Sequence, residues 1–367
     1  MPTDQHANNQ EFDYLIVGQG IAGSVLAWTL GQRGHRVLIV NDAAAPSSSK
    51  VAAGIFNPLT GKKLNLTWKA DDIWPFAQCF YTDLEKSLRT TLLHFCNVYR
   101  PYRSIEEQNT CLAQTAEPNL QQYVQETVND SKYGAFVENP YNGLEITQSG
   151  WVNCVELVEK VGDHFLEKNQ YLNERFNYEL IENKDNEVFY KNIKIKKILF
   201  CEGFEARENP FFDWLPHNPA KGQTILVNIE DYTLTEIINQ GIFIIPIDKK
   251  GLCRVGATYS WDDLDFVSTE DARQFLEEKL QLLLKKPYRI IDQQAGVRPA
   301  TQDRRPFVGL HPELPNLAIF NGLGSKGVSL APYFAAQLAD FLEFDKEIDP
   351  LVNIERFFTL YFHKKNP

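Results

Sequence analysis

Three glycines near the start of the chain have the spacing of a phosphate-binding turn. Gly18, Gly20 and Gly23 follow an apolar run, Tyr14 to Val17, and precede a helical pattern that continues to Leu30. The first glycine permits a tight turn, the second lets the backbone approach a pyrophosphate, and the third lets the helix pack closely on the strand. Amides at the helix start then point at the phosphates. The sequence therefore predicts a strand, a glycine turn and a helix around a dinucleotide.

The acidic residue expected at the end of the second strand is displaced. Arg36 to Val40 have the pattern of this strand, and Gly34 ends the preceding helix. Asn41 follows directly and can donate to or accept from a ribose hydroxyl, whereas Asp42 reaches the ribose only if the strand end bends. Both are candidate ribose ligands, and a solvated turn residue is an equal alternative for Asp42.

A segment of small residues follows the second strand. Residues 47–64, SSSKVAAGIFNPLTGKKL, argue against a regular element and for backbone that lies close to a flat or charged group. Together with the glycine turn, this segment resembles the D-amino-acid oxidase and glycine oxidase superfamily of flavoenzymes. In that family the segment runs beside the flavin, so the resemblance implies cofactor contacts from Ala53 and Gly54.

The resemblance continues to residue 342. GWVN at 150–153 before a predicted helix at 155–168, and ILFCEG at 198–203, are similar to further FAD-binding segments. NGLGSKGV at 321–328 resembles the family's glycine loop, whose helix points at the flavin pyrimidine. The positive end of that helix would favour the negative charge of reduced flavin. The candidate cofactor contacts are Gly18, Gly20, Ile21, Ala22, Gly23, Asn41, Asp42, Ala53, Gly54, Gly203, Gly322, Gly324, Ser325, Lys326, Gly327 and Val328.

Arg298 is the leading candidate for substrate binding. It lies in GVRPATQDRRPFVG at 296–309, which resembles the family's last strand and loop, and it matches the arginine that holds the substrate carboxylate there. A planar guanidinium takes both carboxylate oxygens and so holds the α-carbon in register. The alternative is a structural ion pair with a nearby carboxylate such as Asp303. The sequence offers no Ser/His/Asp or Cys/His arrangement, and flavin oxidation of an amine does not require a strong base.

Lys326 and Tyr259 are the other candidate catalytic residues. Lys326 would add a positive charge beside the flavin, and a solvated lysine at a helix start is the alternative. Glycine-oxidase-like proteins commonly have a tyrosine just before a strand proline, where this chain has Phe243. Tyr259, Tyr102 or Arg103 are candidates to replace that hydroxyl.

Composition limits the class of protein and its partners. The 367 residues are 43% hydrophobic, enough for two domains, and the net charge of -11 would repel a polyphosphate, so no nucleic-acid partner is expected. The N-terminus lacks the apolar core of a signal peptide and no run is long enough to span a bilayer, which predicts a cytoplasmic protein. The six cysteines have no metal-ligand spacing and are expected to be buried free thiols. None lies near Gly296, where sarcosine-oxidase relatives anchor flavin, so noncovalent FAD and no metal are expected.

The expected fold class is α/β, with a Rossmann-type FAD-binding domain and an interleaved α+β substrate domain built on a largely antiparallel sheet. Residues 1–75, 145–210 and 290–367 form the predicted FAD-binding domain, and residues 76–144 and 211–289 form the predicted substrate domain.

Local patterns add detail to the substrate domain. They predict an amphipathic helix near Phe80 to Leu93 and strands at 224–229 and 242–246. Ser268 and Asp271 have the spacing of a capping box at the start of another helix.

Three functions are compatible with these features. The favoured one is FAD-dependent oxidation of the C–N bond of a small amino acid or secondary amine, with oxygen or another acceptor taking the electrons. A second is oxidation of a tRNA wobble-uridine side chain, because the GLGSKG loop is also similar to that of the carboxymethylaminomethyl-modifying enzyme, although the acidic net charge counts against it. The third is a flavoprotein without amine oxidase activity.

Overall fold

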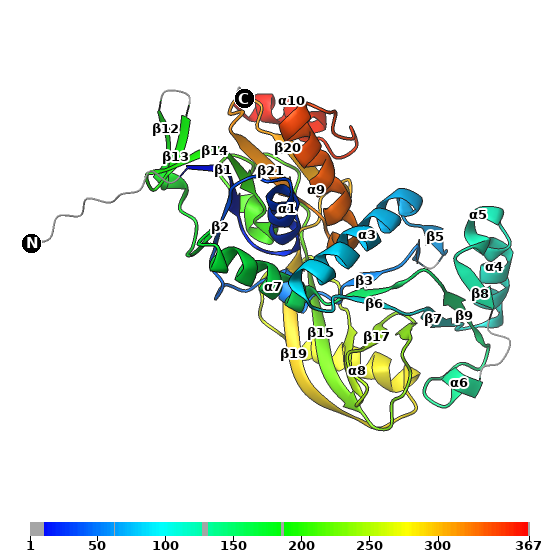
Figure 1. Cartoon of the computed structure of the whole chain (residues 1–367). Helices are drawn as coiled ribbons and strands as arrows, with labels where there is room; N and C mark the ends of the chain where they lie inside the picture. The colour runs from blue at the N-terminus through cyan, green and yellow to red at the C-terminus, as the bar shows by residue number, and fades with distance from the viewer. Residues whose placement is uncertain (1–10, 62, 127–130, 185–186, 366–367) are drawn as a thin grey trace, which may run out of the picture. The chain divides into compact units, whose positions relative to one another are not determined.

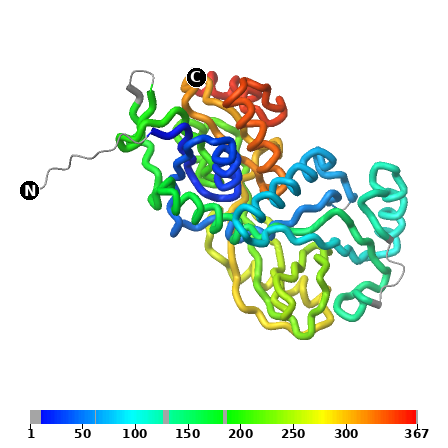
Figure 2. The backbone as a smooth tube through the Cα atoms, viewed as in Figure 1, coloured from blue at the N-terminus to red at the C-terminus, as the bar shows by residue number. Residues whose placement is uncertain are grey.

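The chain forms two compact units that interleave in sequence. The computed structural model describes residues 11–61, 63–126, 131–184 and 187–365. Unit 1 comprises Met1–Lys50, Val155–Pro219 and Arg298–Pro367, and unit 2 comprises Val51–Cys154 and Ala220–Val297. Figure 2 shows the three segments of unit 1 in blue, green and orange to red. The assignment of one unit to the cofactor and the other to the substrate stays a prediction.

Unit 1 contains a mostly parallel sheet with helices packed on it (Figure 1). Its strands and helices are β1 (Glu11–Val17), α1 (Ile21–Gln32), β2 (Val37–Asn41), α2 (Ser48–Val51), α7 (Cys154–Glu167), β11 (Tyr171–Asn173), β12 (Ile181–Lys184), β13 (Glu187–Tyr190), β14 (Ile193–Phe200), β20 (Phe307–Leu310), β21 (Leu317–Asn321), α9 (Gly327–Phe344) and α10 (Phe358–Lys365), with short 3-10 turns at Tyr178–Leu180, Gly203–Glu208 and Ile354–Phe357.

The order of strands in this sheet is that of a dinucleotide-binding fold. β11, β2, β1, β14 and β21 lie side by side and run parallel, while β13 and β12 extend the sheet as an antiparallel hairpin. Tyr14 to Val17 and Val37 to Val40 are entirely buried, as expected for parallel strands covered on both faces. The carboxyl ends of β1 and β14 therefore meet at one edge of the sheet.

Unit 2 is built on an eight-stranded, largely antiparallel sheet in the order β19-β15-β18-β17-β16-β7-β9-β8. Its strands and helices are β3 (Ile55–Phe56), β4 (Leu59–Thr60), β5 (Asn65–Leu66), α3 (Ala70–Leu88), β6 (Leu93–Phe95), β7 (Val98–Pro101), α4 (Ile105–Thr115), α5 (Pro118–Gln121), β8 (Val124–Glu126), α6 (Ser131–Gly134), β9 (Gly143–Ile146), β10 (Gly150–Val152), β15 (Ala220–Ile229), β16 (Ile237–Asn239), β17 (Phe243–Pro246), β18 (Leu252–Gly256), α8 (Glu270–Leu283) and β19 (Tyr288–Arg298).

The large sheet of unit 2 separates two hydrophobic cores. Val227 and Val255 pack with α8 residues such as Leu280 in one core. Ile245 and Ile146 belong to the other core. Successive residues of a strand point to opposite faces, so each strand contributes to both cores or to one core and an exposed surface.

Three local predictions for this region are corrected by the structure. The helix expected near 80–93 spans Ala70–Leu88, because the chain takes a left-handed conformation at Arg89 and then enters β6. The N-cap of α8 is Thr269 rather than Ser268; its hydroxyl accepts from the amide of Ala272. The segment at 47–64 contains one short helix and two-residue strands instead of purely irregular backbone.

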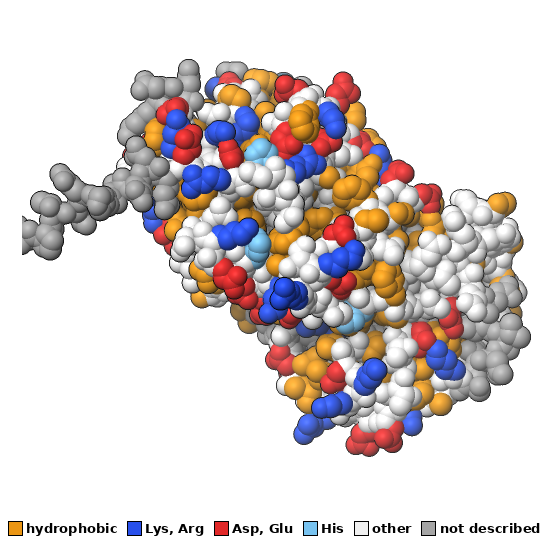
Figure 3. All heavy atoms as spheres, viewed as in Figure 1, with side chains coloured by type: hydrophobic (Ala, Val, Ile, Leu, Met, Phe, Trp, Pro, Cys, Tyr) orange, Lys and Arg blue, Asp and Glu red, His pale blue; other side chains and the backbone are white. Residues whose placement is uncertain are grey.

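The surface charges and the cysteines agree only in part with what the composition predicts. Acidic and basic side chains are interspersed on the face shown in Figure 3. The six cysteines are free; four are buried as expected, whereas Cys79 is exposed and Cys96 half-buried.

In the part of the chain that the structure describes, no helix is long and apolar enough to cross a membrane, and no three side chains form a metal-binding group. The cytoplasmic location stays a prediction.

Candidate functional site

The glycine turn of unit 1 has no room for side chains. Gly18 has a positive φ of 88°, and a Cβ there would lie 2.7 Å from the Cys201 carbonyl oxygen. A Cβ on Gly23 would lie 1.9 Å from the Gly18 carbonyl oxygen. Both distances are shorter than real Cβ contacts, so the predicted requirement for glycine has a steric cause at these two positions. The bare backbone leaves the helix start open to a ligand.

The start of α1 is suited to an anion. It has no side-chain cap and no acidic residue in its first turn. The Ile21 amide donates to the Ser49 hydroxyl at 3.0 Å. Unpaired amides at this end of a helix carry partial positive charge and favour a phosphate. Ser49 was not among the predicted residues, although the serine run at 47–49 was a signal for it.

A second helix start lies beside the first. A Cβ on Gly327 would contact the Ile21 side chain at 3.7 Å, which brings the first turns of α9 and α1 together. α9 also begins without a side-chain cap or an acidic residue in its first turn. Two positive helix ends therefore converge in unit 1. A dinucleotide carries its negative charge in the middle and fits such a position.

Lys326 increases the positive charge at this place. It is half-buried immediately before α9, and its pKa is lowered by burial and by the charges of Arg305 and Arg304. A lysine whose side chain contacts only bulk water would be exposed rather than half-buried. Its predicted role beside the flavin stays a prediction, but the alternative of a solvated surface lysine loses support.

The remaining candidate loops of unit 1 are joined by hydrogen bonds. The Asn321 amide group donates to the Gly203 carbonyl oxygen at 2.9 Å, and the Gly324 amide donates to the Pro299 carbonyl oxygen at 3.1 Å. Gly203 has a positive φ of 59°, with open space where its Cβ would lie. Ser325 is exposed and Val328 is buried. The structure thus brings together the segments after β14, β19 and β21.

Asn41 uses its side chain to hold the glycine turn. Its Oδ1 accepts from the Gln19 amide at 3.0 Å, and its Nδ2 donates to the Tyr171 hydroxyl at 3.0 Å. The Gln19 side chain in turn donates to the Val158 carbonyl oxygen of α7. Asp42 accepts from the Ala44 amide, as a turn residue would. Which of the two binds a ribose stays a prediction.

In unit 2, the candidate cofactor segment is held tightly against β10. The Val152 amide donates to the Gly54 carbonyl oxygen at 2.9 Å. Gly54 has a positive φ of 66°, and a Cβ there would lie 2.0 Å from the Val152 carbonyl oxygen. Ala53 packs against the core beside it.

The candidate substrate residues differ in their surroundings. Arg298 is half-buried at the end of β19. Tyr259 is 54% exposed and packs edge-on against Trp261. Tyr102 is 2% exposed within a hydrophobic core, which makes it a poor candidate to replace the missing tyrosine hydroxyl, and Arg103 is exposed.

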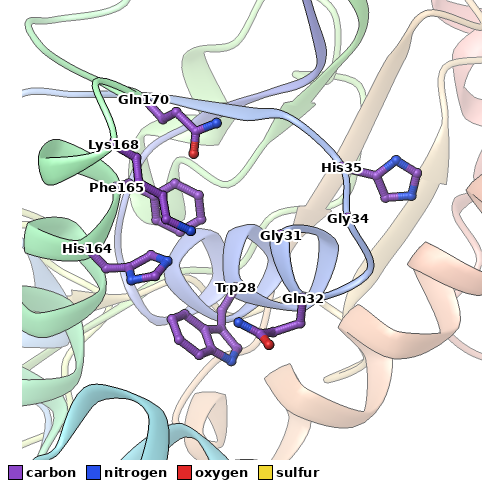
Figure 4. Close-up of a pocket in the computed structure, with 9 residues that line it drawn as sticks. All are labelled: Trp28, Gly31, Gln32, Gly34, His35, His164, Phe165, Lys168 and Gln170. Carbon is purple, nitrogen blue, oxygen red and sulfur yellow. The ribbon is translucent and has the colours of Figure 1, made fainter.

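A pocket of about 130 Å³ lies elsewhere in unit 1 (Figure 4). Trp28, His164 and Lys168 are among the residues that line it, and the first two rings lie 4.9 Å apart. Because it surrounds the C-terminal end of α1, it is at the opposite end of this helix from the glycine turn. It does not belong to the candidate cofactor site.

The parallel sheet, the uncapped helix starts and the sterically required glycines define a dinucleotide-binding protein. The residues present fit FAD, since they provide a bare turn for a pyrophosphate and a second positive helix end. The model of the FAD-dependent oxidoreductase family that includes D-amino-acid oxidase matches residues 13–341, and the chain belongs to this family. It is therefore an oxidoreductase with FAD as its cofactor, and the predicted fold class is confirmed.

Relatives of different function share this fold. The chain is 22% identical to the tRNA 5-methylaminomethyl-2-thiouridine biosynthesis bifunctional protein MnmC of Marinobacter nauticus, over 89% of this chain and 54% of that protein. It thus spans about half the length of the curated relatives that it matches first. The structure of glycine oxidase from Bacillus cereus is 21% identical with a TM-score of 0.75, covering 92% of this chain and 96% of that one. Iminodiacetate oxidase from Chelativorans is 18% identical with a TM-score of 0.74, covering 94% and 98%.

Proposed function

We propose that this FAD-dependent oxidoreductase oxidises the C–N bond of a small amino acid or secondary amine whose carboxylate is held by Arg298. When bound, the flavin supplies the hydride acceptor for the substrate α-carbon. Glycine oxidase and iminodiacetate oxidase, which share the fold, act on substrates of this kind by their names. That likeness supports the proposal without identifying the amine.

The observation that best supports the proposal concerns Asp303, whose carboxylate is the alternative partner of Arg298. Oδ2 of Asp303 accepts from Nε of Arg356 at 2.9 Å. Its Oδ1 accepts from the Arg305 amide at 3.0 Å and from the Thr301 hydroxyl at 3.1 Å. Since both oxygens already serve to hold the loop after β19, Asp303 is poorly suited to be the structural counter-ion of Arg298. The alternative of a structural ion pair between Arg298 and Asp303 therefore loses support.

Arg298 would act by orientation. A guanidinium that takes both carboxylate oxygens leaves the substrate little freedom to rotate about its α-carbon. Holding reacting atoms in register in this way accounts for a large part of the acceleration in many enzymes.

The proposal is tested by anaerobic screening. The purified holoprotein is mixed with single amino acids of both chiralities and with secondary amines, and the flavin absorbance band is followed. Bleaching by at least one compound is expected, and chemical reduction with dithionite shows that the flavin is reducible. If dithionite bleaches the band but no amine does, the chain is a flavoprotein without amine oxidase activity.

A second function, oxidation of a tRNA side chain, is favoured by a specific feature. Arg304, Arg305 and Lys326 lie close enough for their charges to interact, so a concentrated positive charge exists in a chain of net charge -11. The relatives named for tRNA thiouridine biosynthesis add support. The exclusion of nucleic acid from net charge alone is therefore not supported, because local clusters rather than net charge bind phosphates.

Binding of unmodified tRNA distinguishes this second function. A functional interaction would give affinity that falls steeply with salt and that weakens when Arg304 is replaced by glutamine. Absence of binding at low salt would remove this candidate.

A further inference from the structure

The pocket of about 130 Å³ in unit 1 lies where two helices end. α1 contributes Trp28 and Gln32, and α7 with the residue that follows it contributes His164 and Lys168. The members of each pair are four residues apart, so they lie on one face of their helix. Figure 4 shows the Trp28 and Gln32 side chains on the same side of α1. The pocket therefore receives one wall from each helix.

Aromatic rings form the apolar part of this pocket. The Trp28 side chain is 5% exposed, and its ring centroid lies 4.9 Å from that of His164. The buried Phe165 ring meets His164 edge-on. Because Gly31 carries no side chain, the surface of α1 next to the Phe165 ring stays open. A flat ligand ring can pack against rings arranged in this way.

The polar groups of the pocket are not used by the chain itself. In the part of the chain that the structure describes, no hydrogen-bond partner meets the indole N–H of Trp28 or the side chains of Gln32, His164, Lys168 and Gln170. The pKa of His164 is lowered by burial and by the charge of Lys168, so its imidazole is neutral at pH 7 and offers one donor and one acceptor. Each carboxamide adds two donors and an acceptor. The pocket can therefore satisfy a ligand edge on which donors and acceptors alternate.

The charges around the pocket favour a neutral ligand. The C-terminal ends of α1 and α7 both carry partial negative charge, and Lys168 adds a positive charge beside them. His35, which also lines the pocket, is already bound to Glu343 at 2.8 Å, and its ring points away from the other labelled side chains in Figure 4. Because charges of both signs lie this close together, neither an anion nor a cation is strongly favoured.

The volume of the pocket matches a single ring, since an engineered cavity of about 150 Å³ holds one benzene molecule. We propose that this pocket binds a pyrimidine base, which stacks on the rings of Trp28 and His164. The carboxamides of Gln32 and Gln170 then meet the hydrogen-bonding edge of the base. Proteins read unpaired bases with such carboxamides and rings. The site is independent of the proposed oxidation, because it lies at the opposite end of α1 from the glycine turn.

The competing explanation is a surface groove that holds only water. A hydrated groove would not distinguish a pyrimidine from a sugar or from the larger, two-ring purine. Gln32→Ala tests the difference, because Gln32 is exposed and its loss leaves the core intact. Gln274→Ala is the matched control, since Gln274 is an exposed glutamine on α8 of unit 2.

The experiment is isothermal titration calorimetry of the FAD-saturated protein with cytosine, uracil, their nucleosides, adenine and ribose. Saturation with FAD keeps the cofactor site closed to the added bases. At least one pyrimidine should bind with a dissociation constant below about 1 mM, and adenine and ribose should bind more weakly. A nucleoside that binds as tightly as its base indicates a nucleoside ligand, and a nucleoside that does not bind indicates the free base.

The variants show whether the binding takes place in this pocket. Gln32→Ala should weaken pyrimidine binding by about threefold to tenfold, because hydrogen bonds to the base are lost. Trp28→Phe, which removes the indole N–H and part of the stacking surface, should weaken it by at least as much. Gln274→Ala should bind like the wild type. Thermal unfolding checks that each variant is folded, and if Trp28→Phe is not, Gln32→Ala decides.

Two results would overturn the inference. One is a wild type that binds no pyrimidine with a dissociation constant below about 1 mM, or that binds ribose or adenine equally well. The other is pyrimidine binding that Gln32→Ala leaves unchanged. Because the titration measures binding without turnover, its outcome is separate from that of the anaerobic amine screen.

Discussion

Replacing Glu202 by glutamine is expected to change how the stability of the protein depends on pH. Glu202 follows β14, and its Cα would lie 3.2 Å from a Cβ on Gly18 of the glycine turn. Its carboxyl group accepts from the Tyr178 hydroxyl and, at 2.6 Å, from the Asn209 amide group. Burial raises the pKa of Glu202 from 4.5 to about 7, even though these two hydrogen bonds lower it.

The size and sign of the effect follow from this pKa. Because the folded-state pKa of Glu202 is raised, the native protein holds a proton that the unfolded chain has lost between pH 4.5 and about 7. The stabilisation is fully present below pH 4.5 and is lost as the pH rises through 7. At about 1.4 kcal/mol for each pH unit, the difference amounts to about 3 kcal/mol. Glutamine does not titrate and keeps an acceptor and a donor for the two neighbours.

The assay is urea unfolding of FAD-saturated wild type and Glu202→Gln at several pH values from 4.5 to 8. The free energy of unfolding of the wild type, minus that of the variant, should fall by about 3 kcal/mol across this range. Glu208→Gln, at an exposed position on the 3-10 turn that follows Glu202, is the matched control for removing a carboxylate from this segment. A pH-independent difference for Glu202→Gln would refute the reasoning.

Three further predictions concern the cofactor. Gly23→Ala should abolish FAD binding, because the added Cβ would lie 1.9 Å from the Gly18 carbonyl oxygen. Gly31→Ala in the same helix is the control: its Cβ would meet only the Phe165 ring at 3.5 Å, and it should stabilise the protein by up to about 1 kcal/mol. FAD stoichiometry and thermal unfolding check both variants. Acid or heat should release intact FAD into solution, and colour that stays with the denatured chain would contradict noncovalent binding. Lys326→Met should lower the midpoint potential of the flavin by about 30 mV for each 1.4 kcal/mol of lost interaction. Lys346→Met, at the surface, should leave the potential unchanged. If spectroelectrochemical titration finds no change for Lys326→Met either, Lys326 has only an ordinary surface role.

The parts of the fold that follow from local pattern could be predicted from the sequence. The glycine turn between β1 and α1 is one of them, since the buried apolar run and the glycine spacing lie within a few residues. The helix after Gly327 is another. The helix at Ala70–Leu88 was misplaced, because its second turn contains Pro75 and this obscured the periodic pattern.

The parts that depend on distant partners could not be predicted. Ser49 meets the Ile21 amide only after the chain has folded back across 28 residues. Tyr171 reaches Asn41 from 130 residues away. Trp28 carries no local motif, and its place in the pocket at the end of α1 depends on where α7 packs. Such residues are selected by tertiary contacts, which a single sequence does not display.

The most direct test of the account is flavin reduction by an amino acid in wild type, Arg298→Lys and Arg298→Met. Loss of a charge-assisted bidentate contact should cost about 2–5 kcal/mol of substrate binding in Arg298→Met, with the lysine variant between it and the wild type. FAD occupancy should be equal in all three, and decarboxylated analogues should be poor substrates that respond little to the substitution. If Arg298→Met with full FAD is reduced as fast as the wild type at the same amino-acid concentration, Arg298 does not hold the substrate carboxylate and the central claim is contradicted.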